Sequence, residues 1–166
     1  SGMFESFDFL RSWRGGAPAR RERRLHRRTV DYWRQARGDS ALLRLGRFDP
    51  AAVENRLDQG FLVDLTGPEP RLARIAPVLQ DEAGLEGETA ALTDVPAESL
   101  LARFAAHHPR AVETGEPVMA EYDFVTAAGW HVLCRGALLP LSAGGERVDH
   151  VYGVISWKSA KVPKPE

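Results

Sequence analysis

The chain has 166 residues, of which 43% are hydrophobic and 27% are charged, and its formal net charge is −1. This length and composition are sufficient for one globular domain with a single core. Its one cysteine, Cys134, excludes an internal disulfide and a cysteine-rich metal site. No apolar run approaches the roughly 18 residues of a membrane-spanning helix, and no secretory signal is evident. We therefore expect a cytoplasmic protein with no transmembrane segment.

Positive charge is concentrated near the N-terminus. Residues 11–37 contain ten arginines against two acids, so 12 of the 22 basic residues and 21 of the 23 acidic residues lie elsewhere. The basic segment and the acidic remainder attract each other. This attraction favours docking of the segment on the body of the same chain or of a second copy.

The segment 1–18 comes first along the chain. Ser1 and Gly2 resemble the remnant of an expression tag. The apolar residues of the segment recur at near-helical spacing: Phe4, Phe7, Leu10 and Trp13. We expect either a flexible end or a short helix that packs in a dimer or against a partner.

Residues 19–38 are predicted to form a basic amphipathic helix, with a proline before its start and a glycine at its end. Apolar residues recur along one helical stripe that includes Leu25, Tyr32 and Trp33. We expect this stripe to pack on the sheet, on a second copy or on a partner. The arginines off the stripe form a basic surface that includes Arg23, Arg24, Arg27 and Arg28.

The basic surface has two alternative roles. Clustered arginines have affinity for phosphates, but the chain has no zinc-ligand spacing, RNP motif or helix-turn-helix signature, so a nucleic-acid partner is the less favoured reading. A basic helix face is also compatible with binding at a membrane surface.

The middle of the chain predicts a β-hairpin followed by helices. Alternating apolar residues flank the turn sequence GPEP, which predicts strands over about 60–66 and 70–76. Short helices and loops are expected over 78–96. The run AESLLARFAAHHPRAVETG has helical spacing, and its Pro109 predicts a kink or a break near the two preceding histidines.

The last third predicts a three-stranded antiparallel meander from the runs PVMAEYDFVT, WHVLCRGALLPLS and VDHVYGVISW. Centring the first turn on Ala128 pairs Glu121 with Arg135 on one face. On the other face the same register pairs Tyr122 with Cys134 and Phe124 with Val132. The second turn is too long to fix the third strand, so whether His150 or Val151 shares the apolar face stays open.

The order of these elements, two strands, helices and three strands, is that of PAS domains. An ordered set of stretches also resembles the short bacterial stand-alone PAS-like proteins: HRRTVDYWRQARGD, GFLVDL, AGLEGETAAL, RAVETGEPV, ALLPLS and DHVYGVISW. The resemblance spans about residues 25–158. It implies an α+β fold, with a five-stranded antiparallel sheet, helices on one face and the amphipathic helix preceding it. We expect the PAS-like domain over 58–158 and a flexible tail over 159–166.

The resemblance implies a sensory or regulatory module in signal transduction with no chemistry of its own. PAS folds enclose a cavity between sheet and helices, where some members bind haem, flavin or a small metabolite. We expect five side chains to line it: Phe104, Tyr122, Phe124, Val132 and Cys134. Our prediction is an unidentified small ligand and no cofactor, with a haem- or flavin-bearing sensor as the alternative. The expected partners are a second copy, giving a homodimer, and a signalling protein such as a histidine kinase.

The sequence contains no recognisable catalytic constellation. HHP lacks the HExxH spacing of zinc hydrolases, the glycines of AGLEGE lack a following Lys-Ser/Thr, and Ser142 is outside a G-x-S-x-G elbow. Cys134 lies in a predicted strand and not in the helical cysteine motif of flavin photoreceptors, so its expected role is that of a small buried hydrophobe. We therefore expect no enzymatic activity and no metal site.

Overall fold

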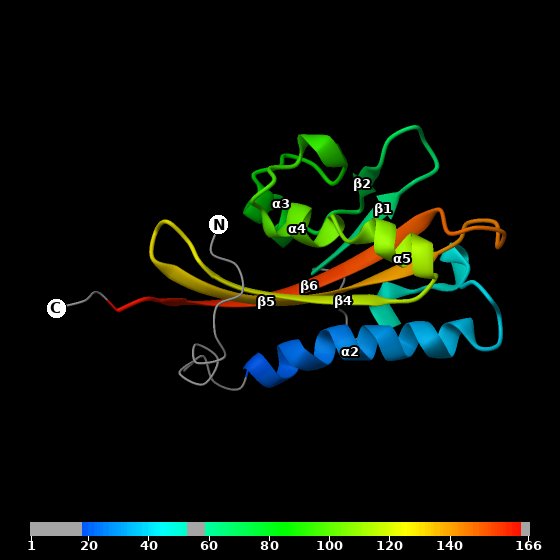
Figure 1. Cartoon of the computed structure of the whole chain (residues 1–166), viewed down its shortest axis with the longest axis horizontal. Coiled ribbons are helices and arrows are strands. Elements are labelled where there is room, and N and C mark those ends of the chain that lie inside the picture. Colours follow the sequence, from blue (N-terminus) through cyan, green and yellow to red (C-terminus); the bar gives the residue numbers. More distant parts are fainter. Residues whose placement is uncertain (1–17, 53–58, 164–166) are drawn as a thin grey trace.

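The structure is a computed structural model that describes residues 18–52 and 59–163, with side chains from residue 25 onward. The segment expected over 1–18 therefore lies outside the described residues apart from Pro18, and so do the side chains of Arg23 and Arg24. In the described part of the chain an antiparallel sheet separates two layers of helices (Figure 1).

The sheet has the strand order β3-β2-β1-β6-β5-β4. Its strands are β1 (Gly60–Asp64), β2 (Arg71–Ala73), β3 (Ala90–Ala91), β4 (Val118–Val125), β5 (Trp130–Leu141) and β6 (His150–Lys161). The five expected strands are present, and the sixth, β3, pairs with β2 at the edge of the sheet. A two-residue strand has no alternation of apolar and polar residues, so the sequence could not reveal it.

The α-helices of the described residues are α2 (Pro18–Arg37), α3 (Pro77–Ala83), α4 (Leu100–Ala105) and α5 (His108–Thr114). The predicted break before Pro109 is present, because α4 ends at Ala105 and α5 begins at His108. Pro109 lies in the first turn of α5, where its missing N–H costs no helical hydrogen bond. Pro77 begins α3 in the same way.

The predicted register of β4 and β5 is confirmed. Glu121 pairs with Arg135 across the two strands, and Arg135 Nε donates to Glu121 Oε2 at 2.8 Å. The structure also fixes the register of β6, in which His150 lies opposite Leu141 of β5. Val151, and not His150, therefore shares the apolar face that the helices α3, α4 and α5 cover.

The sheet is buried on both faces. The inner face packs beneath α3, α4 and α5, and its core includes Phe61, Leu101 and Phe104, each 0% exposed. The outer face packs beneath α2 through a separate cluster that includes Leu139 of β5 and Tyr152 of β6. Helices α3, α4 and α5 thus share one face, as expected, and α2 covers the other. Strands β5 and β6 contribute to both cores.

Helix α2 packs on the outer face through its apolar stripe. Leu25 and Trp33 are buried, and the Trp33 indole Nε1 donates to the carbonyl of Pro140 at 2.8 Å. Tyr32 is half-buried, and its hydroxyl accepts from the amide of Asp49 at 3.1 Å. Of the three surfaces that the sequence left open for this stripe, the structure places it on the sheet of the same chain.

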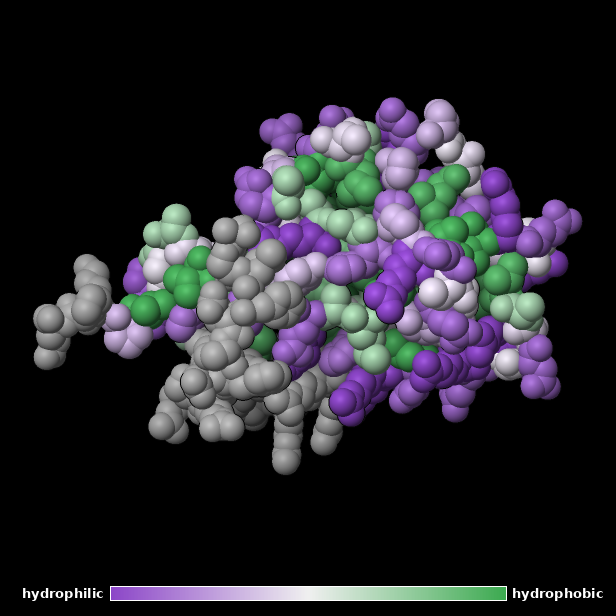
Figure 2. Space-filling model, in the orientation of Figure 1, coloured by the Kyte–Doolittle hydropathy of each residue, from purple (hydrophilic) through white to green (hydrophobic). Residues whose placement is uncertain are grey.

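The opposite side of α2 carries the basic surface. Arg27 and Arg28 are exposed there. Figure 2 shows that the visible part of α2, along the lower edge of the view, is mostly hydrophilic. The helix therefore has the amphipathic character that its spacing predicts.

Some element boundaries differ from the sequence-based expectation. Both hairpin strands, expected over 60–66 and 70–76, are shorter than expected. Strand β2 ends at Ala73, because Arg74 takes a φ of 49° and the chain leaves the sheet there. In contrast, β6 continues to Lys161, which pairs with Trp130 at the start of β5. The first residues of the expected tail 159–166 are therefore part of the sheet.

Candidate functional site

A groove of about 390 Å³ opens on the inner face of the sheet, at the end where β4, β5 and β6 extend past the helices (Figure 1). Its apolar lining consists of Leu100, Phe124, Trp130, Val132 and Trp157. We call this site the aromatic groove. The remaining lining residues are polar: Glu82, Glu98, Thr126 and Ser159.

Strand pairing brings the aromatic side chains of the groove together. Phe124 of β4 lies opposite Val132 of β5. Trp157 of β6 lies opposite Cys134, two residues further along β5 and therefore on the same face as Val132. Trp130 remains 40% exposed, and Figure 2 shows hydrophobic residues at the projecting end of the sheet. An exposed tryptophan beside two further aromatic rings in a concave, mainly apolar surface is typical of a site for a small ligand.

Glu82 joins the groove to helix α4. Its carboxylate accepts hydrogen bonds from the amides of Leu100 at 2.9 Å and Leu101 at 3.4 Å, at the start of the helix. Burial raises the pKa of Glu82, and these two hydrogen bonds offset part of that effect. Glu98, in contrast, is exposed. The Glu82 carboxylate therefore stabilises the start of α4, whereas the Glu98 carboxylate is available to a ligand.

Arg103 of α4 packs against the ring of Phe124 in the aromatic groove. Its guanidinium carbon is 4.2 Å from the centre of the Phe124 ring, and its Nε donates to the carbonyl of Glu98 at 3.0 Å. Its Nη1 is buried without a hydrogen-bond partner among the described residues. A cation held over the face of Phe124 fixes the orientation of this ring.

The five predicted pocket residues lie on the inner face, but they do not form one lining. Phe124 and Val132 line the aromatic groove, whereas Phe104 and Cys134 are 0% exposed within the core. Tyr122 lies between the two sets, with its ring edge-on to Phe104 at a centroid distance of 5.2 Å. Sequence reasoning missed both tryptophans of the groove. One tryptophan lies at the start of β5 and the other towards the end of β6, so their shared location can be predicted only when the pairing register of these two strands is known.

His107 and Tyr122 form a short contact beside the core, with 2.5 Å between the ring Nε2 and the phenol oxygen. Burial, together with the charge of Arg110, lowers the pKa of His107. Burial raises the pKa of Tyr122. Both shifts favour the neutral forms, so this contact is a hydrogen bond between uncharged groups at neutral pH.

Cys134 is a buried thiol with no reactive character. Its Sγ donates to the carbonyl of Tyr122 at 3.6 Å, and burial raises its pKa to about 12. Because the thiolate is the nucleophile, we expect native protein at pH 8.5 to react with iodoacetamide at least about a hundredfold more slowly than the same protein in urea. Mass spectrometry over time measures this ratio. Alkylation of the native protein at the rate of a free thiol would contradict the burial of this side chain.

Residues 18–52 and 59–163 contain no group of three or more His, Cys, Asp or Glu side chains arranged to hold a metal ion. Among these same residues no helix is both long and apolar enough to cross a membrane.

Comparison with known proteins gives matches only among solved structures. No family model and no curated protein matches the chain. "Structure of an RNA-binding Light-Oxygen-Voltage Receptor" matches with 23% identity and a TM-score of 0.40, over 65% of this chain and 31% of that chain. The chain thus spans about a third of that receptor's length.

Two further matches are light-oxygen-voltage (LOV) proteins. A fungal LOV domain photoreceptor is 15% identical with a TM-score of 0.42, covering 95% of this chain and 100% of that chain. "Flavin Analogue Sheds Light on Light-Oxygen-Voltage Domain Mechanism" is 14% identical with a TM-score of 0.42, covering 69% and 84%. All three matched structures are less than 25% identical to this chain and have TM-scores below 0.5.

The expectation of no cofactor is wrong by this comparison, because the matched structures are LOV proteins and one of them is described with a flavin analogue. At the centre of the inner face the ring of Phe104 lies over Gly136, where a methyl group would be 2.7 Å from that ring. The aromatic groove, of about 390 Å³, combines the rings of Trp130 and Trp157 with the hydroxyl groups of Thr126 and Ser159.

Proposed function

We propose that this chain is a non-catalytic sensory or regulatory module in signal transduction, with the aromatic groove as its input site and α2 as its output element. The observation that supports the proposal is that β5 and β6 contribute side chains to both faces of the sheet. On the inner face Val132 and Trp157 of these strands line the groove, and on the outer face Leu139 and Tyr152 hold α2. A ligand on one face and a helix on the other therefore contact the same two strands.

The ligand that fits the groove is a small molecule with a flat aromatic ring. Trp130, Trp157 and Phe124 would stack on its faces, and the hydroxyl of Ser159 and the carboxylate of Glu98 would bind its polar edge. A flavin is one such ring system and, when bound, supplies light absorption and electron transfer. Cys134 is too deeply buried to act on it from the groove.

Signalling follows from a shift between two docking states of α2. A ligand that favours one arrangement of β5 and β6 also changes the surface on which Trp33 and Leu25 pack. The equilibrium between docked and released α2 moves by as much as the ligand's affinity differs between the two states. A signalling protein such as a histidine kinase, or a second copy of the chain, would read that change.

The first test is ligand binding at the groove. We expect riboflavin to bind the chain with a dissociation constant that rises at least about thirtyfold in Trp130→Ala/Trp157→Ala, because stacking contributes roughly 1–3 kcal/mol per ring and two rings are removed. The absorption spectrum reports any cofactor that co-purifies, and the fluorescence anisotropy of riboflavin reports titrated binding.

Two control variants show whether the loss of binding is specific to the aromatic rings of the groove. Trp130→Phe/Trp157→Phe keeps two flat rings and is expected to stay near wild type, as is Met119→Ala, whose side chain is 55% exposed outside the groove. Bound ligand is expected to change the rate at which trypsin cleaves the arginine-rich helix α2. The proposal fails if the preparation is colourless and riboflavin binds no more weakly to the tryptophan double variant.

A further inference from the structure

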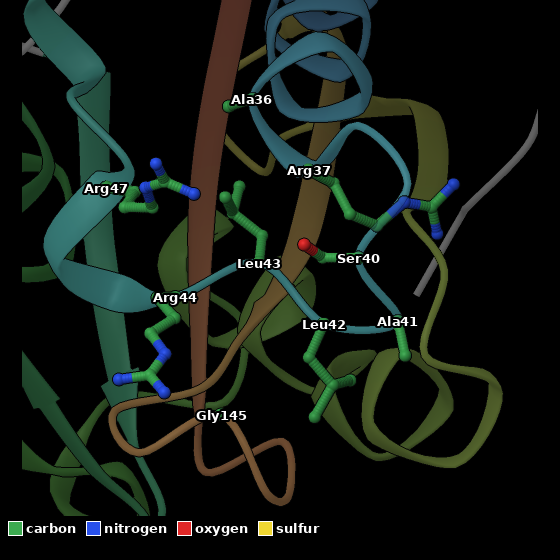
Figure 3. A pocket seen from close by; sticks show the side chains of 9 residues that line it. All are labelled: Ala36, Arg37, Ser40, Ala41, Leu42, Leu43, Arg44, Arg47 and Gly145. Carbon is green, nitrogen blue, oxygen red and sulfur yellow. The ribbon is translucent and has the colours of Figure 1, made fainter.

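A second pocket, of about 360 Å³, lies where the end of α2, the linker that follows it and the β5–β6 loop meet (Figure 3). Its charged lining residues are Arg37, Arg44 and Arg47, and no acidic residue lines it. We call it the arginine pocket. It shares no lining residue with the aromatic groove, so a ligand site in this pocket is independent of the proposed function.

Two of the three arginines of this pocket have guanidinium groups available for hydrogen bonds to a ligand. The side chains of Arg44 and Arg47 are exposed, and neither forms a hydrogen bond or an ion pair with a described residue. Arg37 Nη1 binds Glu116 Oε2 at 2.8 Å, but its Nε is buried and has no hydrogen-bond partner among the described residues. The guanidinium carbon of Arg37 also lies 4.6 Å from the centre of the Trp33 ring, so Arg44 and Arg47 are the arginines available to a ligand.

The backbone around the pocket is held in place by hydrogen bonds. The amide of Leu45 donates to the carbonyl of Ser142 at 2.8 Å, and the amide of Ser142 donates to the carbonyl of Leu43 at 2.9 Å. These bonds tie the linker after α2 to the end of β5. A tethered linker presents its arginines at a fixed place, which lowers the entropy cost of binding.

Gly145 is the point where the β5–β6 loop meets this linker. It has a φ of 86°, and its amide donates to Ser142 Oγ at 2.7 Å. A methyl group at this glycine would lie 2.9 Å from Arg44 Nε, so the absence of a side chain is what allows the guanidinium to lie against the loop. The loop and the linker therefore form one wall of the pocket together.

The arrangement of the arginines indicates the kind of ligand. Figure 3 shows Arg44 and Arg47 on one side of Leu43 and Arg37 on the other, so a single small ion cannot contact all three guanidinium groups. Between them lie the apolar side chains of Leu42 and Leu43. We propose that the arginine pocket binds a small organic anion that carries two or more phosphate or carboxylate groups on a carbon skeleton. A concave site of this size, with leucine side chains between its arginines, favours such a molecule over the backbone of a nucleic acid.

The experiment titrates the full chain with adenosine diphosphate and, separately, with citrate, by isothermal calorimetry in about 0.1 M salt. We expect one of the two to bind, and its dissociation constant to rise about tenfold to hundredfold in Arg44→Ala/Arg47→Ala, the loss typical of charge-assisted hydrogen bonds. Binding of adenosine diphosphate alone assigns phosphate recognition, and binding of citrate alone assigns carboxylate recognition. In Arg44→Lys/Arg47→Lys we expect intermediate affinity, because lysine keeps the charge and loses the planar fork.

The matched control is Arg71→Ala/Arg110→Ala, which removes two exposed arginines that do not line the pocket. It is expected to bind like wild type. The inference is overturned if neither anion binds, if the control loses as much affinity as the pocket variant, or if single-stranded RNA binds and adenosine diphosphate fails to compete with it. Circular dichroism confirms that each variant folds. Riboflavin binding at the aromatic groove is expected to be the same in the arginine variants, so failure at one site is distinguishable from failure at the other.

Discussion

Replacing Trp33 with alanine is expected to lower the free energy of unfolding by about 3–5 kcal/mol, the usual cost of removing a buried tryptophan. The side chain is 1% exposed in the cluster between α2 and the sheet, and its indole donates to the Pro140 carbonyl at 2.8 Å. A loss of this size is a large fraction of the roughly 5–15 kcal/mol that stabilises a domain. Urea unfolding followed by circular dichroism measures the change, and trypsin cleavage shows whether α2 has left the sheet.

Two variants of the same helix separate the contributions of this residue. Trp33→Phe keeps most of the apolar contact and loses the indole donor, so we expect a smaller cost of about 1–2 kcal/mol. Arg34→Ala changes the next residue, which is exposed, and should stay within about 0.5 kcal/mol of wild type. Equal stability of Trp33→Ala and Arg34→Ala would show that α2 does not pack on the sheet in solution.

The second large effect is expected for Phe104→Ala, again about 3–5 kcal/mol. Phe104 is 0% exposed, covers Gly136 of β5 and meets Tyr122 edge-on at 5.2 Å. Its removal leaves a cavity at the centre of the inner face, between Gly136 and Tyr122. The measurement is the unfolding free energy from urea denaturation.

A double-mutant cycle tests the packing of Phe104 on Gly136. Gly136→Ala alone is expected to cost about 1–3 kcal/mol, because the new methyl group meets the Phe104 ring at 2.7 Å. In the Phe104→Ala background the same change should cost less, although the carbonyl of Val154, also at 2.7 Å, keeps part of the clash. Strictly additive costs would mean that the ring does not lie over this glycine.

The sequence predicted the features that depend on short-range geometry. The tight turn at Ala128 set the register of β4 and β5, and that register brought Glu121 and Arg135 into an ion pair at 2.8 Å. The apolar stripe of α2 was readable because helical periodicity places Leu25 and Trp33 on one side. Both predictions needed only residues close together in the chain.

Features that depend on long-range pairing were not predictable. Strand β5 is buried along nearly its whole length, so it shows no alternation that would say which side faces α2 and which side faces α4. Trp130 and Trp157 line the same groove only because the last hairpin pairs in one particular register across a long loop. Phe104 and Cys134 were expected in a cavity wall, but an apolar residue that fills a core has the same sequence pattern as one that lines a pocket.

The burial of β5 and β6 on both faces has a consequence for where the chain can be cut. The range 58–158 is the expected PAS-like domain, yet a fragment with those ends would lack α2 and expose the apolar outer side of the sheet. That side carries Leu139, Leu141, Tyr152 and Val154, which are at most 6% exposed in the whole chain. A bare apolar sheet surface of this kind promotes self-association. The smallest soluble unit therefore starts at or before α2, and shorter truncations would precipitate before their ligand binding could be assayed.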